Sequence, residues 1–292
     1  MQNNNTNITV VRAQTGPPHA GKVFAAVHAH LSDVPYFAAG LCARLMEEGY
    51  TGYIIRTTND EKSGKGSIAE NILSNEQEHL KMAGALGFKD VFDLYYRSHF
   101  MDTIAAVEIQ SRLVLLFRML KVDTVISFNP SAEGDYDSDH MVTAYAVQEA
   151  AGMAGQDHDF HEHFEAGFQP HAVLERYHMC AKPGQPFNRV VDISSQINRK
   201  IEAIAQCKSQ GGGNLGSQLR ARLAGEGKRL PLLGNDDRTA NREYIRHFLL
   251  DDTRNTAKPH NLQYVERFFY VDHRRPARSK VEEYVTKNAV RI

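Results

Sequence analysis

The sequence has few cysteines and almost no net charge. Its 292 residues include three cysteines, Cys42, Cys180 and Cys207, and none forms a CxxC pair. An odd number at such wide spacing gives no disulfide framework and favours a reducing compartment, so we expect a cytoplasmic protein. The formal net charge of -1 gives no overall attraction for nucleic acid or for an anionic membrane. No apolar run approaches the roughly 18 residues of a membrane span.

The apolar content of 42% is enough for one large core. Residues 1–20 are polar and lack the apolar stretch of a secretion signal, so we expect a flexible leader. A single domain is then expected over residues 21–275, followed by a tail over 276–292. Residues 211–260 are polar and contain several Gly residues, and we expect an insertion there that covers the open end of the domain as a lid or forms a subunit contact.

Short apolar runs alternate with segments of helical spacing over the first 150 residues. The runs predict strands over 22–28, 50–57, 91–95 and 122–128, and the spacing predicts helices over 36–48, 69–86, 103–120 and 141–151. Such alternation is typical of an α/β fold with a doubly wound, mostly parallel sheet and helices on both faces.

Two segments place histidine and aspartate at strand ends. His30 and Asp33 follow the first strand, and Asp137 to His140 close the loop after the 122–128 strand and lead into the next helix. In open α/β sheets, ligands bind outside the carboxyl ends of the strands. Two imidazoles and a carboxylate are the ligands of a catalytic zinc site with one open position. The alternative interpretation is that Asp33 or Asp139 only caps the following helix.

The same segments resemble a known family. AVHAHLSDV resembles the AHPDDE signature of the PIG-L/LmbE-like zinc-dependent N-deacetylases, with Ala29, His30 and Asp33 in register. TVISFNPSAEGDYDSDH resembles the strand, loop and HPDH signature of that family, with Gly134, Asp139 and His140 in register. Further similar elements extend the resemblance over about residues 20–270: the helix from Glu78 to Gly87, Val191–Ser194, Lys200, Ser209–Gln210 and Tyr264–Phe268.

The resemblance implies that His30, Asp33 and His140 bind Zn²⁺, or another divalent metal. It implies an LmbE-like α/β domain in which a metal-bound water attacks an amide, such as the N-acetyl group of an amino sugar or small metabolite. Asp139, next to His140, is then expected to orient a neighbouring catalytic group. The expected partner is a small-molecule substrate, without nucleic acid or membrane, and self-association is left open.

The departures from the family pattern affect the proton-transfer positions. Ser32 stands where the family has the carboxylate that acts as general base, and a serine hydroxyl does not take a proton near neutral pH. Asp137 stands where the family has the first HPDH histidine, and an ionised carboxylate there would repel a developing oxyanion. Asn75 stands at the position of the substrate-binding arginine.

Three outcomes are compatible with these departures. In the first, Asp137 acts as a relocated base or acid beside the metal. In the second, the site cleaves a different bond whose leaving group needs no histidine. In the third, the protein is a catalytically retired scaffold that binds a metal or a small ligand. Glu61 is a secondary candidate for the base, and we expect substrate contacts from Asn75, Glu61 and Asn129.

Other polar groups favour structural interpretations. His28 lies on the first strand and is expected to be a core residue or to support a ligand. The histidine-rich segment 157–165 is expected to be an exposed loop or helix start. The triple glycine 211–213 lacks the lysine of a phosphate-binding loop. The basic stretches 220–229 and 274–278 are expected to be solvated.

Overall fold

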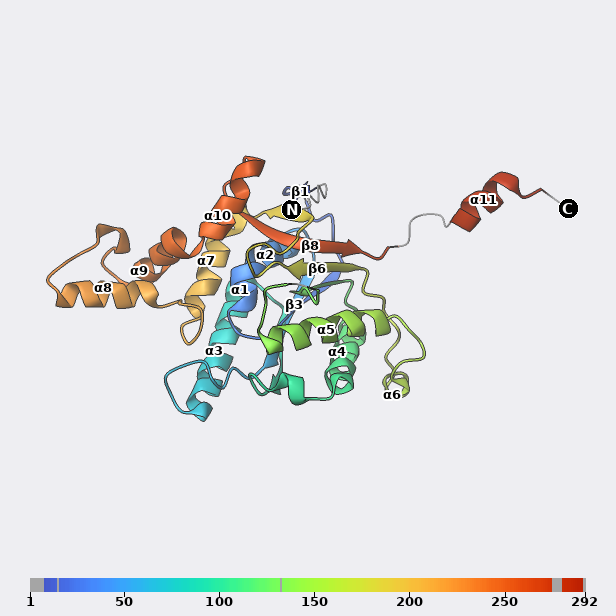
Figure 1. Ribbon diagram of the computed structural model, residues 1–292, viewed down its shortest axis with the longest axis horizontal. Helices are drawn as coiled ribbons and strands as arrows, with labels where there is room; N and C mark the ends of the chain where they lie inside the picture. The colour runs from blue at the N-terminus through green and yellow to red at the C-terminus, as the bar shows by residue number, and fades with distance from the viewer. Residues whose placement is uncertain (1–7, 15, 132, 275–279, 291–292) are drawn as a thin grey trace.

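The computed structural model describes residues 8–14, 16–131, 133–274 and 280–290 (Figure 1). Eight strands form one sheet in the order β1-β7-β8-β6-β5-β2-β3-β4. Only β8 among these strands runs antiparallel to its neighbours, β6 and β7, and the other pairs are parallel. The prediction of a mostly parallel α/β sheet is confirmed. The strand bounds are β1 Thr9–Val11, β2 Val23–His28, β3 Thr51–Thr58, β4 Asp90–Tyr96, β5 Thr124–Phe128, β6 Glu175–Met179, β7 Arg189–Asp192 and β8 Val265–Asp272.

Helices cover both faces of the sheet. Alternate residues of β2 belong to different cores, because successive side chains of a strand point to opposite faces. Phe24 and Ala26 pack with the helices α1, α2, α3 and α7, whereas Ala25 and Val27 pack with α4 and α5. The bounds are α1 Asp33–Phe37, α2 Ala39–Glu47, α3 Ile68–Leu86, α4 Ala106–Leu120, α5 Ser138–Met153, α6 His161–Glu165, α7 Ile197–Gln206, α8 Leu215–Gly225, α9 Asp237–Tyr244, α10 Asp251–Ala257 and α11 Lys280–Asn288.

The strand order reverses between β2 and β5. From β2 the chain continues outward to β3 and β4, and it then returns to the other side of β2 as β5 and β6. In open α/β sheets, ligands bind outside the carboxyl ends of the strands at such a reversal. We call this edge of the sheet, at the carboxyl ends of β2 and β5, the crevice. The segment that begins at His30 leaves β2 at this crevice, and the segment that ends at His140 follows β5 at the same edge.

Two predicted helices differ from the structure. The helix expected over 36–48 is two helices, α1 and α2, separated at Ala38, whose φ of -144° is not helical. The helix expected from residue 141 begins at Ser138, because the side chain of Asp137 accepts a hydrogen bond from the Asp139 backbone N–H and caps it. Asp139 and His140 therefore lie in the first helical turn and not in the preceding loop.

The domain limits also differ from the prediction. Thr9–Val11, placed in the expected flexible leader, form β1 and pair with β7 at the edge of the sheet. Within the expected tail, Lys280–Asn288 form α11, while residues 275–279 lie outside the described part of the chain. No helix among the described residues has the length and apolar character needed to cross a membrane.

The segment 211–260 is largely helical. Its helices α8 and α9 pack against each other, and α9 also contacts α7 (Figure 1). The start of the segment lies at the crevice, because a Cβ atom on Gly211 would come within 2.7 Å of the Ser32 Cβ. A lid or subunit-contact role for this segment stays a prediction.

Candidate metal centre

Asp33 is fixed by the turn that follows β2. Its Oδ2 atom accepts hydrogen bonds from the backbone N–H groups of Ala29 at 3.1 Å and His30 at 2.6 Å. The carboxylate therefore folds back over the end of the strand and lies beside the His30 ring. Both side chains are buried, with 5% and 6% of Asp33 and His30 exposed.

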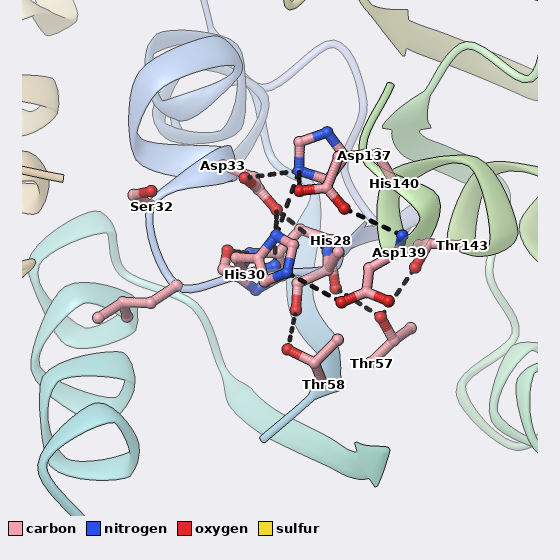
Figure 2. A network of polar contacts seen from close by, with 12 residues as sticks. His28, His30, Ser32, Asp33, Thr57, Thr58, Asp137, Asp139, His140 and Thr143 are labelled. Atoms are coloured by element: carbon pink, nitrogen blue, oxygen red, sulfur yellow. Dashed lines mark hydrogen bonds and ion pairs between the residues drawn. The ribbon is translucent and has the colours of Figure 1, made fainter. Parts of the chain in front are cut away.

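His140 comes from the other side of the crevice. It lies in the first turn of α5, and its ring stacks on Phe128 at the end of β5, with 4.0 Å between ring centroids. The strand and the helix that follows it thus hold the imidazole from two sides. Figure 2 shows His140 directed toward His30 and Asp33.

Two imidazole nitrogens and the two oxygens of the Asp33 carboxylate lie close together. Nδ1 of His30 and Nε2 of His140 are 3.2 Å apart, and Nε2 of His140 is 3.5 Å from Oδ1 of Asp33. Nδ1 of His30 is 3.8 Å from Oδ2 of Asp33. Ligand atoms about 2.0–2.1 Å from a tetrahedral zinc ion lie roughly 3.3 Å from one another. The two nitrogens have this spacing and the Asp33 oxygens lie slightly farther from them, so the three side chains are candidate ligands of a divalent cation.

The opposite nitrogen of each imidazole is held by a carboxylate. Nε2 of His30 donates to Oδ2 of Asp139 at 3.2 Å, and Nδ1 of His140 donates to Oδ2 of Asp135 at 2.9 Å. Such carboxylates fix the tautomer and the orientation of metal-binding histidines and raise their basicity. The sequence predicts that Asp139 orients a catalytic group, and the group that it contacts is the predicted ligand His30.

The electrostatic field of the site favours a cation. Burial by itself lowers the pKa of His30, but the hydrogen bond to Asp139 and the charge of Asp33 raise it to about 9. Burial likewise lowers the pKa of His140, and the hydrogen bonds to Asp135 and Asp33 raise it to about 10. Burial raises the pKa of Asp33, which the two histidines bring down to about 2. The carboxylates of Asp33, Asp135 and Asp139 thus outnumber the two imidazoles and stabilise positive charge at this site.

Asp137 lies close to the candidate metal-binding atoms, and Ser32 does not. The Ser32 Oγ donates to Oε1 of Gln210 at 3.1 Å, and Ser32 lies apart from the cluster in Figure 2. The Asp137 side chain is 26% exposed, and its Oδ2 atom is 3.9 Å from Nε2 of His140. An oxygen of Asp137 lies within 4.8 Å of a nitrogen of His30 and of His140. Asp137 is therefore a further candidate ligand beside the two histidines, whereas Ser32 is hydrogen-bonded to Gln210.

The three residues expected to contact the substrate form hydrogen bonds within the protein. Asn75 is fully buried and donates from Nδ2 to the backbone oxygens of Ser63 and Asn71. Glu61 accepts a hydrogen bond from Arg97 at 3.0 Å, and this bond lowers the pKa of Glu61. Asn129 accepts a hydrogen bond from the Ser131 backbone N–H at 2.9 Å. These contacts stabilise the loops around the crevice, and substrate binding by the three residues stays a prediction.

The other histidines singled out from the sequence lie away from the donor atoms. Nδ1 of His28 donates to the backbone oxygen of His30 at 2.7 Å, which agrees with the expected supporting position. In the segment 157–165, His163 is buried and its Nδ1 lies 3.1 Å from Nη1 of Arg118. Only part of the basic stretch 274–278 can be placed, because residues 275–279 lie outside the described part of the chain.

Two polar residues of this site are absent from the sequence-based prediction. Asp135 holds His140, and a carboxylate five residues before a ligand histidine at a helix start is a signal that could have indicated it. His99, on the loop after β4, has its ring centroid 6.0 Å from that of His30. Nothing in the local sequence distinguishes His99, since only the parallel pairing of β3 and β4 brings its loop to the crevice.

The doubly wound α/β sheet carries this group of donor side chains where its strand order reverses. Residues 25–151 match the family model described as PIG-L, GlcNAc-PI de-N-acetylase. The predicted resemblance to the PIG-L/LmbE-like family is therefore confirmed, and the matched segment contains His30, Asp33 and His140.

Solved structures share this fold. N,N'-diacetylchitobiose deacetylase from Pyrococcus horikoshii has a TM-score of 0.68 and 18% identity, over 88% of this chain and 86% of that one. GalB, the 4-carboxy-2-hydroxymuconate hydratase from Pseudomonas putida, has a TM-score of 0.62 and 18% identity, over 88% and 99%. The conserved protein TT1542 from Thermus thermophilus has a TM-score of 0.60 and 19% identity, over 84% and 92%. At these identities the likeness establishes the fold, and the activity is argued from the site.

Proposed function

We propose that this protein is a metal-dependent hydrolase that cleaves an amide, the N-acetyl group of an amino sugar or a related small metabolite. The observation that carries the proposal is the convergence of Nδ1 of His30, Nε2 of His140 and the Asp33 carboxylate at metal-ligand spacing. The match to the de-N-acetylase family model over the same residues supports the choice of an amide.

His30, Asp33 and His140 would hold the cation. Asp139 and Asp135 would fix the two imidazoles by accepting hydrogen bonds from the ring nitrogens that do not face the cation. When bound, Zn²⁺ supplies a Lewis acid and lowers the pKa of a coordinated water to about 7. Three protein ligands leave one position open for water and substrate, as in other catalytic zinc sites.

In this proposal Asp137 accepts the proton. Its Oδ1 atom accepts the N–H of Asp139, and its Oδ2 atom lies 3.9 Å from Nε2 of His140. Asp139, in contrast, is fully buried, and its Oδ2 atom accepts hydrogen bonds from His30 and from the His99 backbone N–H. The base of this enzyme would therefore be the residue that caps the N-terminus of α5, whereas the position after β2 where the family has its base holds Ser32.

The test is turnover by the zinc-loaded protein on a panel of N-acetylated amino sugars and simple acetylated amines. Asp137→Asn should lower kcat by about 10² to 10⁴, the usual contribution of a positioned base, without loss of metal. Asp157→Asn is the matched control, because Asp157 is an exposed carboxylate outside the site. Unchanged turnover in Asp137→Asn would remove Asp137 from the mechanism.

A second candidate is a metal-binding or ligand-binding protein without hydrolase activity. Ser32 favours it, because the expected base is missing and its replacement is bonded to Gln210. Stoichiometric metal without turnover on any amide of the panel would support this candidate over the hydrolase.

A further inference from the structure

The loop between β4 and the 3₁₀ turn Met101–Thr103 places a third imidazole at the metal centre. His99 is exposed, and its ring is inclined by 36° to the His30 ring. One of its nitrogens lies with an oxygen of Asp137 and an oxygen of Asp139 in a group of atoms that are all within 4.8 Å of one another. His99 thus lies beside Asp137, the carboxylate that acts as base in the proposed function.

The backbone of His99 is fixed to the same site. Its N–H donates to Oδ2 of Asp139 at 2.6 Å, the oxygen that also accepts from Nε2 of His30. His99 has a φ of +62°, a left-handed conformation that is unfavourable for a non-glycine residue. The hydrogen bond to a buried carboxylate offsets that cost and fixes the backbone from which the imidazole extends beside Asp137 and Asp139.

Its neighbours hold this loop in place. Asn59 donates its backbone N–H to the backbone oxygen of Tyr96 at 2.8 Å, which joins the ends of β3 and β4. The side chains of Arg97 and Lys62 lie over the ring of Phe100, which is next to His99. His99 is therefore an exposed side chain on an anchored loop.

We propose that His99 is a catalytic residue that donates a hydrogen bond from its ring N–H to the substrate carbonyl oxygen as negative charge develops there. This role rests on the proposed amide hydrolysis. A carboxylate at position 137 cannot donate such a bond, while an imidazole can do so in its neutral form and without transferring a proton. In this proposal, Asp137 supplies the basic carboxylate that the family has at the position of Ser32. His99 supplies the imidazole that the family has at the position of Asp137.

Two variants of His99 separate its side chain from its backbone. His99→Gly removes the ring and suits the left-handed backbone, because glycine adopts positive φ without strain. His99→Gln keeps an N–H donor on a side chain of similar reach. His158→Ala is the control, since His158 is an exposed histidine with 87% of its side chain accessible. For each zinc-loaded protein we would measure metal content, kcat on an N-acetyl substrate and the Kd of acetohydroxamic acid.

We expect His99→Gly to lower kcat by about 10²-fold, as for loss of an oxyanion donor. Acetohydroxamic acid should bind about 10-fold more weakly, a difference of roughly 1.4 kcal/mol. Metal content should be unchanged, His99→Gln should recover part of both losses, and His158→Ala should match the wild type.

Three results would overturn the proposal. Wild-type kcat in His99→Gly would exclude a contact with the reacting group. Loss of metal in His99→Gly would make His99 a support of the ligand set. If wild type binds zinc and acetohydroxamic acid but hydrolyses no amide, the proposed function fails by itself. Equal affinity of wild type and His99→Gly for acetohydroxamic acid would then reject the role of His99 as well.

Discussion

The Oδ2 atom of Asp135 accepts a hydrogen bond from Nδ1 of His140 at 2.9 Å. This bond leaves Nε2 of His140 to face His30 and Asp33. Removing a carboxylate that orients a ligand histidine weakens metal binding by about 10- to 100-fold in other proteins. We therefore expect Asp135→Ala to weaken Zn²⁺ affinity by that factor in a chelator competition assay. Asp135→Asn keeps an acceptor oxygen and should lose less, and affinity unchanged in Asp135→Ala would show that Phe128 alone orients the ring.

A buried ion pair connects α7 with the last strand of the sheet. Nζ of Lys200 is 2.7 Å from Oε1 of Glu266, and Glu266 also accepts the backbone N–H groups of Gly40 and Leu41 at the start of α2. Breaking such a pair leaves a buried charge and costs about 3–5 kcal/mol. Lys200→Met should lower the free energy of unfolding in urea by that amount.

The double variant Lys200→Met with Glu266→Gln should lose less than the sum of the two single changes, because it leaves neither charge unpaired. The control is Lys228→Met, whose partner Glu226 is exposed and whose ion pair is worth about 1 kcal/mol or less. Additive single losses would contradict coupling of Lys200 with Glu266.

The buried His178 on β6 makes stability depend on pH. Burial lowers its pKa, Arg176 and His273 lower it further, and the hydrogen bond to the backbone oxygen of Phe128 acts in the opposite direction. The unfolded chain therefore takes up a proton near pH 6.5 that the folded protein does not bind. The stabilisation is complete above that pH and is lost as the pH falls below it, by at most about 1.4 kcal/mol per pH unit.

Urea unfolding of wild type and His178→Gln at pH 7.5 and pH 5 measures this contribution. The wild type should lose more stability between the two pH values than the variant. Equal losses would show that His178 does not contribute to the acid sensitivity of the fold.

The sheet could be predicted from the sequence because it depends on local patterns, whereas the ligand set follows from the resemblance to a known family and stays a prediction. Apolar runs identified β2, β3 and β5. A histidine or aspartate that directly follows a parallel strand is expected at the carboxyl edge of the sheet. The break at Ala38 and the start of α5 at Ser138 were missed, because helix ends depend on backbone geometry and on one capping side chain. The strand β1 was missed because three residues in a polar leader carry too short a pattern.

The supporting residues of the site could not be predicted in the same way. Asp135 and His99 act through contacts at the crevice, with His140 in one case and with Asp139 in the other. His99 is one of 14 histidines in the chain, and only the tertiary fold distinguishes it from the others. Ser32 illustrates the same limit, because its bond to Gln210 joins residues 178 positions apart.

The central claim is that His30, Asp33 and His140 bind a metal ion, and metal analysis of the purified protein tests it most directly. Wild type, His140→Ala and the control His158→Ala would be purified without added zinc and then exposed to equal amounts of Zn²⁺. We predict about one equivalent of bound metal in wild type and in His158→Ala, and loss of that metal in His140→Ala. Equal metal content in wild type and His140→Ala would contradict the account.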